Sequence, residues 1–173
     1  MRLFVGLRPS DVFRSALSLL QDRLRAAGVT GRYLNASNLH MTLAFIGEWA
    51  EDVTDNLPGV DTPFSLTLSH IGFFPEAKVM WAGVEQSDAL QRLAGRVRHS
   101  LAEAGIPFDP KQFNPHITLV RKPSVPNGIN ISEIEIPPAV MAVEEVCLYR
   151  SDRGKNGMAY TVIGSSRGEP ERP

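Results

Sequence analysis

The chain of 173 residues carries the same series of structural signals twice, at a fixed offset of 77 positions. In the first copy, a short apolar run precedes Ser10, and apolar residues at helical spacing then continue up to Gly28. In the second copy, Ser87 and Gly105 take the places of that serine and glycine. Serine favours the start of a helix and glycine its end, so each copy predicts a strand followed by a capped amphipathic helix. A shared offset across all of these signals indicates an internal duplication.

The remaining elements follow from short β-prone runs and from their punctuation by glycine and proline. Acidic, proline-containing residues 48–63 predict a surface loop or short helix between the copies. Strands are predicted at 3–7, 40–43, 64–73, 80–84, 116–119, 130–136, 142–149 and 160–164. Two helices and many short strands favour an α+β fold with mainly antiparallel pairing. We expect two pseudo-symmetric lobes, each with a helix outside its sheet and a cleft between them. Residues 1–165 would form this single bilobal domain, and residues 166–173 a frayed tail.

Each copy also contains the tetrapeptide pattern His-x-Thr-Leu, at His40–Leu43 and again at His116–Leu119. On a strand, residues two positions apart point to the same face. His40 therefore shares a face with Thr42, and His116 shares one with Thr118, while the intervening apolar residues face the core. One such motif would carry little weight, but two of them in register with a duplication indicate a functional site.

Two imidazoles facing each other across a cleft suit general acid–base chemistry at a phosphorus atom. One neutral histidine accepts a proton from the attacking hydroxyl, and one protonated histidine gives a proton to the leaving oxygen. The two threonines can donate hydrogen bonds to the non-bridging phosphate oxygens. The alternatives are structural histidines on packed strands or zinc ligands. The only cysteine, Cys147, lies in another segment, and no carboxylate stands at ligand spacing in either motif.

The paired motifs on duplicated halves resemble the 2H phosphoesterase superfamily, and most closely its RNA 2′,3′-cyclic phosphodiesterase branch, also called 2′-5′ RNA ligase. The resemblance extends from Arg2 to about Ile163. It is carried by the opening RLFVGL, by NLHMTLAFIGE and FNPHITLVRK around the two motifs, and by the closing LYRSDRGKNGMAYTVI.

The resemblance implies hydrolysis of a 2′,3′-cyclic phosphate to a 2′-phosphate, without a metal or other cofactor. It implies that His40 is the proton donor to the leaving O3′ and that His116 is the proton acceptor from water. Thr42 and Thr118 would bind the phosphate, and Arg121 would add positive charge. Run backward, the same site would join RNA ends through a 2′-5′ linkage.

Three further residues are candidate contacts to the base or backbone of RNA. Tyr33 stands where the family usually has a tryptophan, and it offers a ring for stacking. Arg150 and Arg153 belong to the basic turn 150–157, which is either a solvated hairpin tip or a contact to the RNA backbone.

Composition narrows the possible partners. With 18 basic and 19 acidic residues the net charge is −1, so nothing in the bulk charge favours duplex DNA or an anionic membrane. We expect a monomer in the cytoplasm that needs no protein partner and acts on RNA 3′ ends or nucleoside 2′,3′-cyclic phosphates. The alternatives are non-catalytic binding of phosphorylated RNA ends, and the same chemistry on another cyclic phosphate or on a 2′-5′ linkage.

Overall fold

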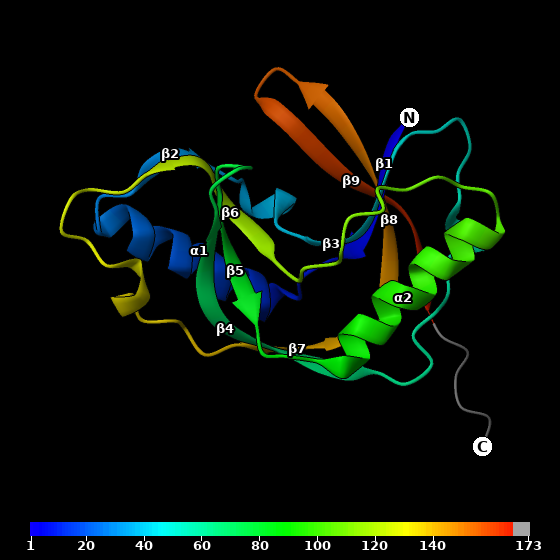
Figure 1. The fold of residues 1–173 in the computed structure, drawn as a ribbon, viewed down its shortest axis with the longest axis horizontal. Helices are drawn as coiled ribbons and strands as arrows, with labels where there is room; N and C mark the ends of the chain where they lie inside the picture. The colour runs from blue at the N-terminus through cyan, green and yellow to red at the C-terminus, as the bar shows by residue number, and fades with distance from the viewer. Residues whose placement is uncertain (168–173) are drawn as a thin grey trace.

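The computed structural model describes residues 1–167, and in this range two helices flank a nine-stranded, mainly antiparallel sheet (Figure 1). The helices are α1 (Asp11–Ala26) and α2 (Asp88–Glu103). The strands are β1 (Arg2–Leu7), β2 (Thr30–Tyr33), β3 (Met41–Glu48), β4 (Phe64–Phe74), β5 (Val79–Val84), β6 (Ile117–Ser124), β7 (Val140–Val143), β8 (Glu145–Gly154) and β9 (Gly157–Arg167). The α+β class expected from the sequence is confirmed.

The repeated signals of the sequence give repeated structure. Helix α2 begins and ends 77 positions after α1, and β5 has the same offset from β1. The side chains of Ser10 and Ser87 both accept a hydrogen bond from the backbone amide three residues on, as helix caps do. Gly28 and Gly105 both have positive φ, at 93° and 71°, where a side chain would be strained.

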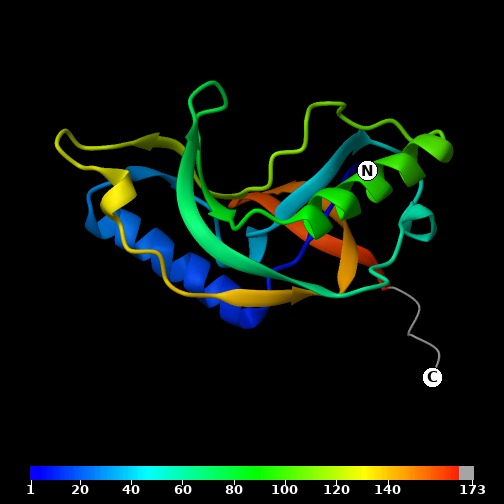
Figure 2. The ribbon, with the colours of Figure 1, turned by 60° about the horizontal axis from the view of Figure 1, so that its bottom comes forward.

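The order of strands in the sheet is itself symmetric about its centre. It runs β7-β4-β5-β6-β3-β1-β8-β9, with β2 added beside β6. The two motif strands, β3 and β6, meet at the centre through the antiparallel pair Met41–Ile117. Only Glu144 separates β7 from β8, which lie near opposite ends of this order, so the sheet curls strongly and brings its two ends toward each other (Figure 2).

The two lobes do not coincide with the two halves of the sequence. Helix α1 packs against β6 and β7 of the second half, and α2 packs against β3 of the first half. Strand β2 likewise pairs with β6, and the amide of Asp109 donates to the carbonyl of Phe45 in β3. Each half therefore covers the motif strand of the other, and the helices lie at opposite ends of the molecule (Figures 1 and 2).

Two of the predicted strands are wrong in detail. Residues 130–136 form a short 3-10 turn, Ile131–Glu133, because the side chain of Asn130 accepts from the amide of Ser132 and starts a turn there. The predicted strand 142–149 is divided at Glu144 between β7, which pairs with β4, and β8, which pairs with β1 and β9. The adjacent glutamates Glu144 and Glu145 interrupt the apolar residues at this point, and the segments on the two sides of the interruption pair with different strands.

The predicted tail begins too early. Ser166 and Arg167 complete β9, where they pair with β8, and the rest of the predicted tail (168–173) lies outside the described residues. Strand pairing uses backbone groups, so it does not need apolar side chains. The hydroxyl of Ser166 also donates to the carbonyl of Leu57 in the loop before β4.

The hydrophobic core lies between the helices and the outer surface of the curled sheet. Met41 and Ile117, the pair at the centre of the sheet, are 1% and 3% exposed, and Leu43 and Leu119 are fully buried. Neither helix in the described part of the chain has the length and apolar character needed to cross a bilayer.

Met41→Ala should lower the free energy of unfolding by about 2–5 kcal/mol, because it opens a cavity beneath the strand pair that joins the two lobes. Guanidinium denaturation followed by circular dichroism would measure this. Val140→Ala is the matched control, since Val140 is a 55% exposed strand residue, and it should change stability by less than about 0.5 kcal/mol. Equal losses for the two variants would contradict this account of the core.

Candidate active site

The central strand pair brings both His-x-Thr motifs to one surface of the sheet. Met41 lies opposite Ile117 in an antiparallel pair, so the histidine and threonine that flank each of these residues lie along one seam. His40 has Thr42 beside it on its own strand, and Thr42 lines a cavity together with His116. The buried residues between them face the core, which directs all four polar side chains to the inner surface of the curl.

His40 is held by local hydrogen bonds that fix which ring nitrogen carries the proton. Its Nδ1 lies 2.7 Å from the carbonyl oxygen of Asn38, and a carbonyl can only accept, so Nδ1 is the protonated nitrogen. Its Nε2 lies 3.1 Å from Oγ1 of Thr42 and is the unprotonated nitrogen of the neutral ring. The reactive nitrogen therefore sits beside a hydroxyl that can contact phosphate.

His116 repeats this arrangement. Its Nδ1 lies 2.7 Å from the carbonyl oxygen of Asn114, which is the counterpart of Asn38 in the second copy. Both histidines thus keep Nε2 free of a proton while neutral, which is the form needed by a general base.

Aromatic rings surround the two histidines. Phe4, Tyr149 and Tyr160 lie with their ring centroids 4.7, 5.5 and 5.0 Å from that of His40. Phe74 and Trp81 lie 5.0 and 6.1 Å from His116. These low-dielectric walls remove water from the imidazoles, which disfavours their charged form.

Burial accordingly lowers the pKa of His40 to about 4, and it also lowers the pKa of His116. The positive charge of Arg121 acts in the same direction on both, and each bond to a backbone carbonyl opposes the shift. Both imidazoles are therefore neutral in the free protein at neutral pH, and a proton on either one requires an added negative charge nearby.

Each motif strand is anchored by a side chain from the helix of the other half. Gln21 of α1 is 3% exposed, and its amide donates to the carbonyls of Leu34 and Leu119, both at 3.0 Å. At the equivalent position of α2, Arg98 donates to the carbonyls of Leu43 and Lys111, at 3.2 and 2.6 Å. In both halves one of the anchored carbonyls belongs to the leucine of His-x-Thr-Leu. These side-chain hydrogen bonds, which we call the clamps, therefore set the positions of the strands that carry the histidines.

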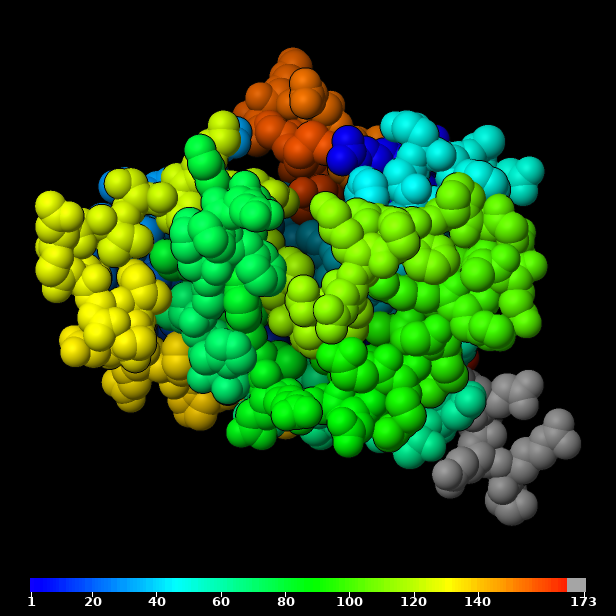
Figure 3. All heavy atoms as spheres, in the orientation of Figure 1, coloured from blue at the N-terminus to red at the C-terminus, as the bar shows by residue number. Residues whose placement is uncertain are grey.

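A hollow between the β8–β9 hairpin, the β4–β5 turn and the segment before β6 is visible in Figure 3. A cavity of about 690 Å³ on the His40 side is lined by His40, Thr42 and Arg121, and also by Arg2 and Arg153. The structure thus brings Arg121 and Arg153 together with the first motif on the wall of one cavity. Thr42 also lines a second cavity, of about 430 Å³, together with His116.

Two of the predicted contacts lie elsewhere. The guanidinium carbon of Arg25 lies over the Tyr33 ring, 4.0 Å from its centroid, and the Tyr33 hydroxyl donates to the carbonyl of Val29. These contacts pack the ring of Tyr33 against its own half of the molecule. Arg150 forms an ion pair with Asp152 at 2.7 Å. Neither residue is among those that line the cavity beside His40.

The aromatic walls were missed by sequence reasoning. Phe4 and Trp81 lie at equivalent positions of the two copies, and each stands in an apolar run that does not by itself mark it as a site residue. Trp81 pairs with Thr118 across β5 and β6, so it faces the site. The offset of 77 between these residues is the signal by which the duplication could have indicated them.

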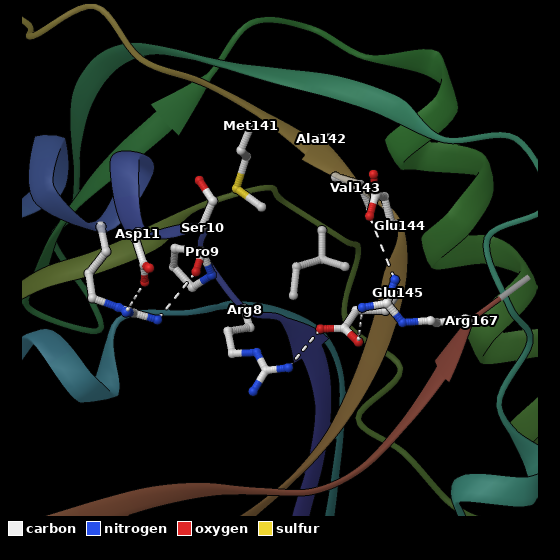
Figure 4. Close-up of a pocket in the computed structure, with 12 residues that line it drawn as sticks. Arg8, Pro9, Ser10, Asp11, Met141, Ala142, Val143, Glu144, Glu145 and Arg167 are labelled. Atoms are coloured by element: carbon white, nitrogen blue, oxygen red, sulfur yellow. Dashed lines mark hydrogen bonds and ion pairs between the residues drawn. The ribbon is translucent and has the colours of Figure 1, made fainter.

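Another pocket, of about 490 Å³, opens at the start of α1, and none of the predicted residues lines it (Figure 4). Its charged groups are paired with one another. Arg8 lies 2.8 Å from Glu145, Arg14 lies 3.1 Å from Asp11, and Arg167 contacts Glu144 and Glu145 at 3.6 and 3.5 Å. With its charges balanced in this way, we assign it no role in the chemistry.

Comparison with known proteins agrees with this geometry. The model of the 2′-5′ RNA ligase superfamily matches residues 13–155. The chain belongs to this family. An RNA 2′,3′-cyclic phosphodiesterase of Thermotoga maritima is 30% identical over 176 residues, which cover 94% of this chain and 93% of that protein. The Escherichia coli protein of the same name is 36% identical over 143 residues, or 77% of each chain.

Solved structures show the same fold. The apo form of E. coli LigT superposes with a TM-score of 0.78 at 30% identity, covering 96% of each chain. TT0787 of Thermus thermophilus superposes with a TM-score of 0.76 at 29% identity, covering 99% of this chain and all of that one. LigT has also been solved in complex with 3′-AMP, with a TM-score of 0.76 to this chain. The family expected from the paired motifs is therefore confirmed.

Arg98→Met should lower the free energy of unfolding by about 1–3 kcal/mol, because it leaves the carbonyls of Leu43 and Lys111 without their donor. Denaturation by guanidinium would measure the loss. Arg96→Met is the matched control on the same helix, since Arg96 is exposed, and it should have little effect. If Arg96→Met is as destabilising as Arg98→Met, the clamp is not the cause.

In the free protein, the ring protons of His40 should titrate with a midpoint near pH 4. Proton NMR of the His40→Asn and His116→Asn variants would assign the signals. Because the pKa of His40 is lower folded than unfolded, its neutral ring stabilises the fold fully above about pH 6.5. That contribution should be lost as the pH falls toward 4. A His40 midpoint at or above 6.5 would contradict the burial described here.

Proposed function

We propose that this protein hydrolyses RNA 2′,3′-cyclic phosphates through a site centred on His40 and His116. The single observation that carries the proposal is the antiparallel meeting of the two motif strands at Met41 and Ile117, beside a cavity lined by three arginines. Strand alternation from this pair supports a site in which both imidazoles and both threonine hydroxyls face the same concave surface. The relatives named RNA 2′,3′-cyclic phosphodiesterase and the membership of the family support cyclic phosphate hydrolysis as the reaction.

In the proposed mechanism, the phosphorus atom lies between the two Nε2 atoms. His116 takes a proton from the attacking water, and the water oxygen forms a bond to phosphorus. The bond from phosphorus to O3′ breaks, and His40 gives its Nε2 proton to that oxygen. The product carries a 2′-phosphate. Each carbonyl bond to Nδ1 keeps the reacting Nε2 pointed at the site during these transfers.

The substrate itself supplies the charge that makes His40 an acid. A cyclic phosphate carries a negative charge, and its approach to the neutral ring raises the pKa of His40 toward the working pH. Thr42 and Thr118 donate to the non-bridging oxygens, and Arg121 lies at the rim of the same cavity. His40 therefore takes up its proton when the substrate binds.

The side of the site on which each histidine lies supports the assignment of the donor. In an in-line displacement, the leaving oxygen belongs to the RNA strand that bears the cyclic phosphate. Arg2, Arg121 and Arg153 all lie on the His40 side, where they would meet the phosphates of that strand. His40 is thus the proposed donor to the leaving group, and His116 the proposed acceptor.

His40→Ala and His116→Ala should each lower turnover of a nucleoside 2′,3′-cyclic phosphate by about 100-fold or more, since each removes one proton-transfer group. Phosphorus NMR would follow the appearance of the 2′-phosphate. His99→Ala is the matched control, because His99 is 72% exposed on α2 and pairs with Glu103, and it should retain full activity. Binding of the cyclic phosphate without turnover by the unmodified protein would instead identify a non-catalytic binder.

The donor and acceptor roles can be separated with a better leaving group. A substrate whose bridging O3′ is replaced by sulfur needs little protonation, so it should restore much of the rate lost in His40→Ala but not in His116→Ala. Restoration in His116→Ala alone would reverse the two roles.

The pH profile of kcat/KM should be bell-shaped with its maximum below pH 6.5, because burial lowers the pKa of both histidines in the free protein. The maximum of kcat should lie at higher pH, because bound phosphate raises those pKa values.

Activity should also persist in EDTA, since residues 1–167 contain no group of three or more metal-ligating side chains placed to hold a metal ion. Loss of activity in EDTA with recovery on adding zinc would contradict the acid–base mechanism.

A further inference from the structure

The two halves of the site differ where the duplication would make them alike, and the difference opens a pocket beside His116. On the His40 side, Tyr149 of β8 stacks on Phe4 of β1 with centroids 4.8 Å apart, and both are nearly fully buried. On the His116 side, the counterpart of Phe4 is Trp81, and the counterpart of Tyr149 is Gly72 of β4. A glycine therefore stands where the first half has a large ring.

Glycine at this position is required by packing. A Cβ atom on Gly72 would overlap the indole of Trp81, and a Cβ atom on Gly83 would overlap the ring of His70. The two glycines allow these rings to lie against the sheet. Phe74 completes the cluster, with its centroid 4.9 Å from that of Trp81, and the ring of His70 lies 5.5 Å from the same indole.

The pocket formed in this way has a volume of about 420 Å³ and an aromatic wall made of His70, Phe74 and Trp81. Its polar lining carries side-chain amides from Gln86, Gln91 and Asn114, together with Glu85 and Ser87. The counterpart of Asn114 in the first half, Asn38, is instead bonded to the backbone of Met158 and Tyr160 in β9, which closes that side. The second half thus leaves open a surface that the first half covers.

Aromatic faces with amides at the rim match the chemistry of a nucleobase, which stacks by its faces and hydrogen-bonds by its edge. Among the residues that line this pocket Glu85 alone is charged, so a phosphate is disfavoured there, whereas three arginines line the cavity beside His40. The His116 side therefore fits a neutral base, and the His40 side fits a charged backbone.

We propose that the pocket formed by His70, Phe74 and Trp81 binds the nucleobase of an acceptor nucleoside, whose 5′-hydroxyl then takes the place of water. This rests on the proposed function, because in-line displacement puts the nucleophile on the side of the proton acceptor, His116. Phe74 contacts that imidazole directly, with centroids 5.0 Å apart, so a base stacked in the pocket lies next to the entry point of the nucleophile.

The transfer step balances without another reactant. The 5′-oxygen forms a bond to phosphorus as the bond from phosphorus to O3′ breaks. The hydroxyl proton goes to Nε2 of His116, and the proton on Nε2 of His40 goes to O3′. The product is a 2′-5′ phosphodiester.

Fluorescence of Trp81 tests the binding site without any reaction. In a Trp49→Phe background, Trp81 is the only tryptophan, and adenosine should produce a saturable quench. Phe74→Ala and His70→Ala should each raise the Kd for adenosine about tenfold, as expected for the loss of a stacking partner. His70 is exposed, so this variant does not depend on the core tolerating the change. Phe73→Ala is the control, because Phe73 is 47% exposed on the opposite face of β4, and it should leave the Kd unchanged. An unaltered Kd in both Phe74→Ala and His70→Ala would overturn the proposal.

Product analysis tests the assignment to the acceptor. With adenosine 2′,3′-cyclic phosphate as donor and excess adenosine, the ratio of 2′-5′ dinucleoside product to 2′-phosphate should fall about tenfold in His70→Ala. The ratio cancels any general defect in catalysis, since both products come from the same two histidines. If adenosine acts only as a competitive inhibitor and no dinucleoside forms, the pocket serves the base of the cyclic phosphate itself and the acceptor assignment is wrong.

The two proposals fail in different ways. Saturable quenching by adenosine in a protein that does not hydrolyse the cyclic phosphate would reject the proposed function, because adenosine would then bind without any hydrolysis. Hydrolysis without quenching would reject the base site alone.

Discussion

The arrangement of this molecule depends on one backbone pairing, between Met41 and Ile117 at the centre of the sheet. It fixes the relative position of the two motif strands, and the alternation of side chains along each strand then decides which residues face the site. A slip of one residue would turn His40 or His116 into the core. The paired residues are almost fully buried, so hydrophobic packing resists such a slip. The same strand pair therefore positions the histidines on the inner surface and stabilises the packing on the outer surface.

Much of this could be predicted from the sequence, because the informative signals are local. The caps at Ser10 and Ser87, the helical spacing between cap and glycine, and the alternation around each histidine depend on neighbours in the chain. The site residues that follow from strand alternation, such as Thr42 beside His40, needed no knowledge of the tertiary structure. Their roles in catalysis stay predictions until the variants are measured.

The features that could not be predicted are those decided by distant partners. No local signal indicates that α1 packs on β6 and β7 of the second half, or that the segments on the two sides of Glu144 join strands near opposite ends of the sheet. Tyr33 illustrates the limit for the site. Its ring is attractive for stacking in the sequence, but Arg25 and the carbonyl of Val29 occupy it in the fold. Trp81 shows the reverse, since its apolar surroundings conceal that it faces the histidines.

The exchange of helices between the halves makes the two copies interdependent. A single copy of the repeat would leave its motif strand uncovered, because Gln21 and Arg98 both donate to carbonyl groups of the other copy. Loss of either helix would therefore expose the strand that carries the histidine of the opposite half. Because both copies belong to one chain, equivalent positions can hold different residues, such as Tyr149 in one copy and Gly72 in the other.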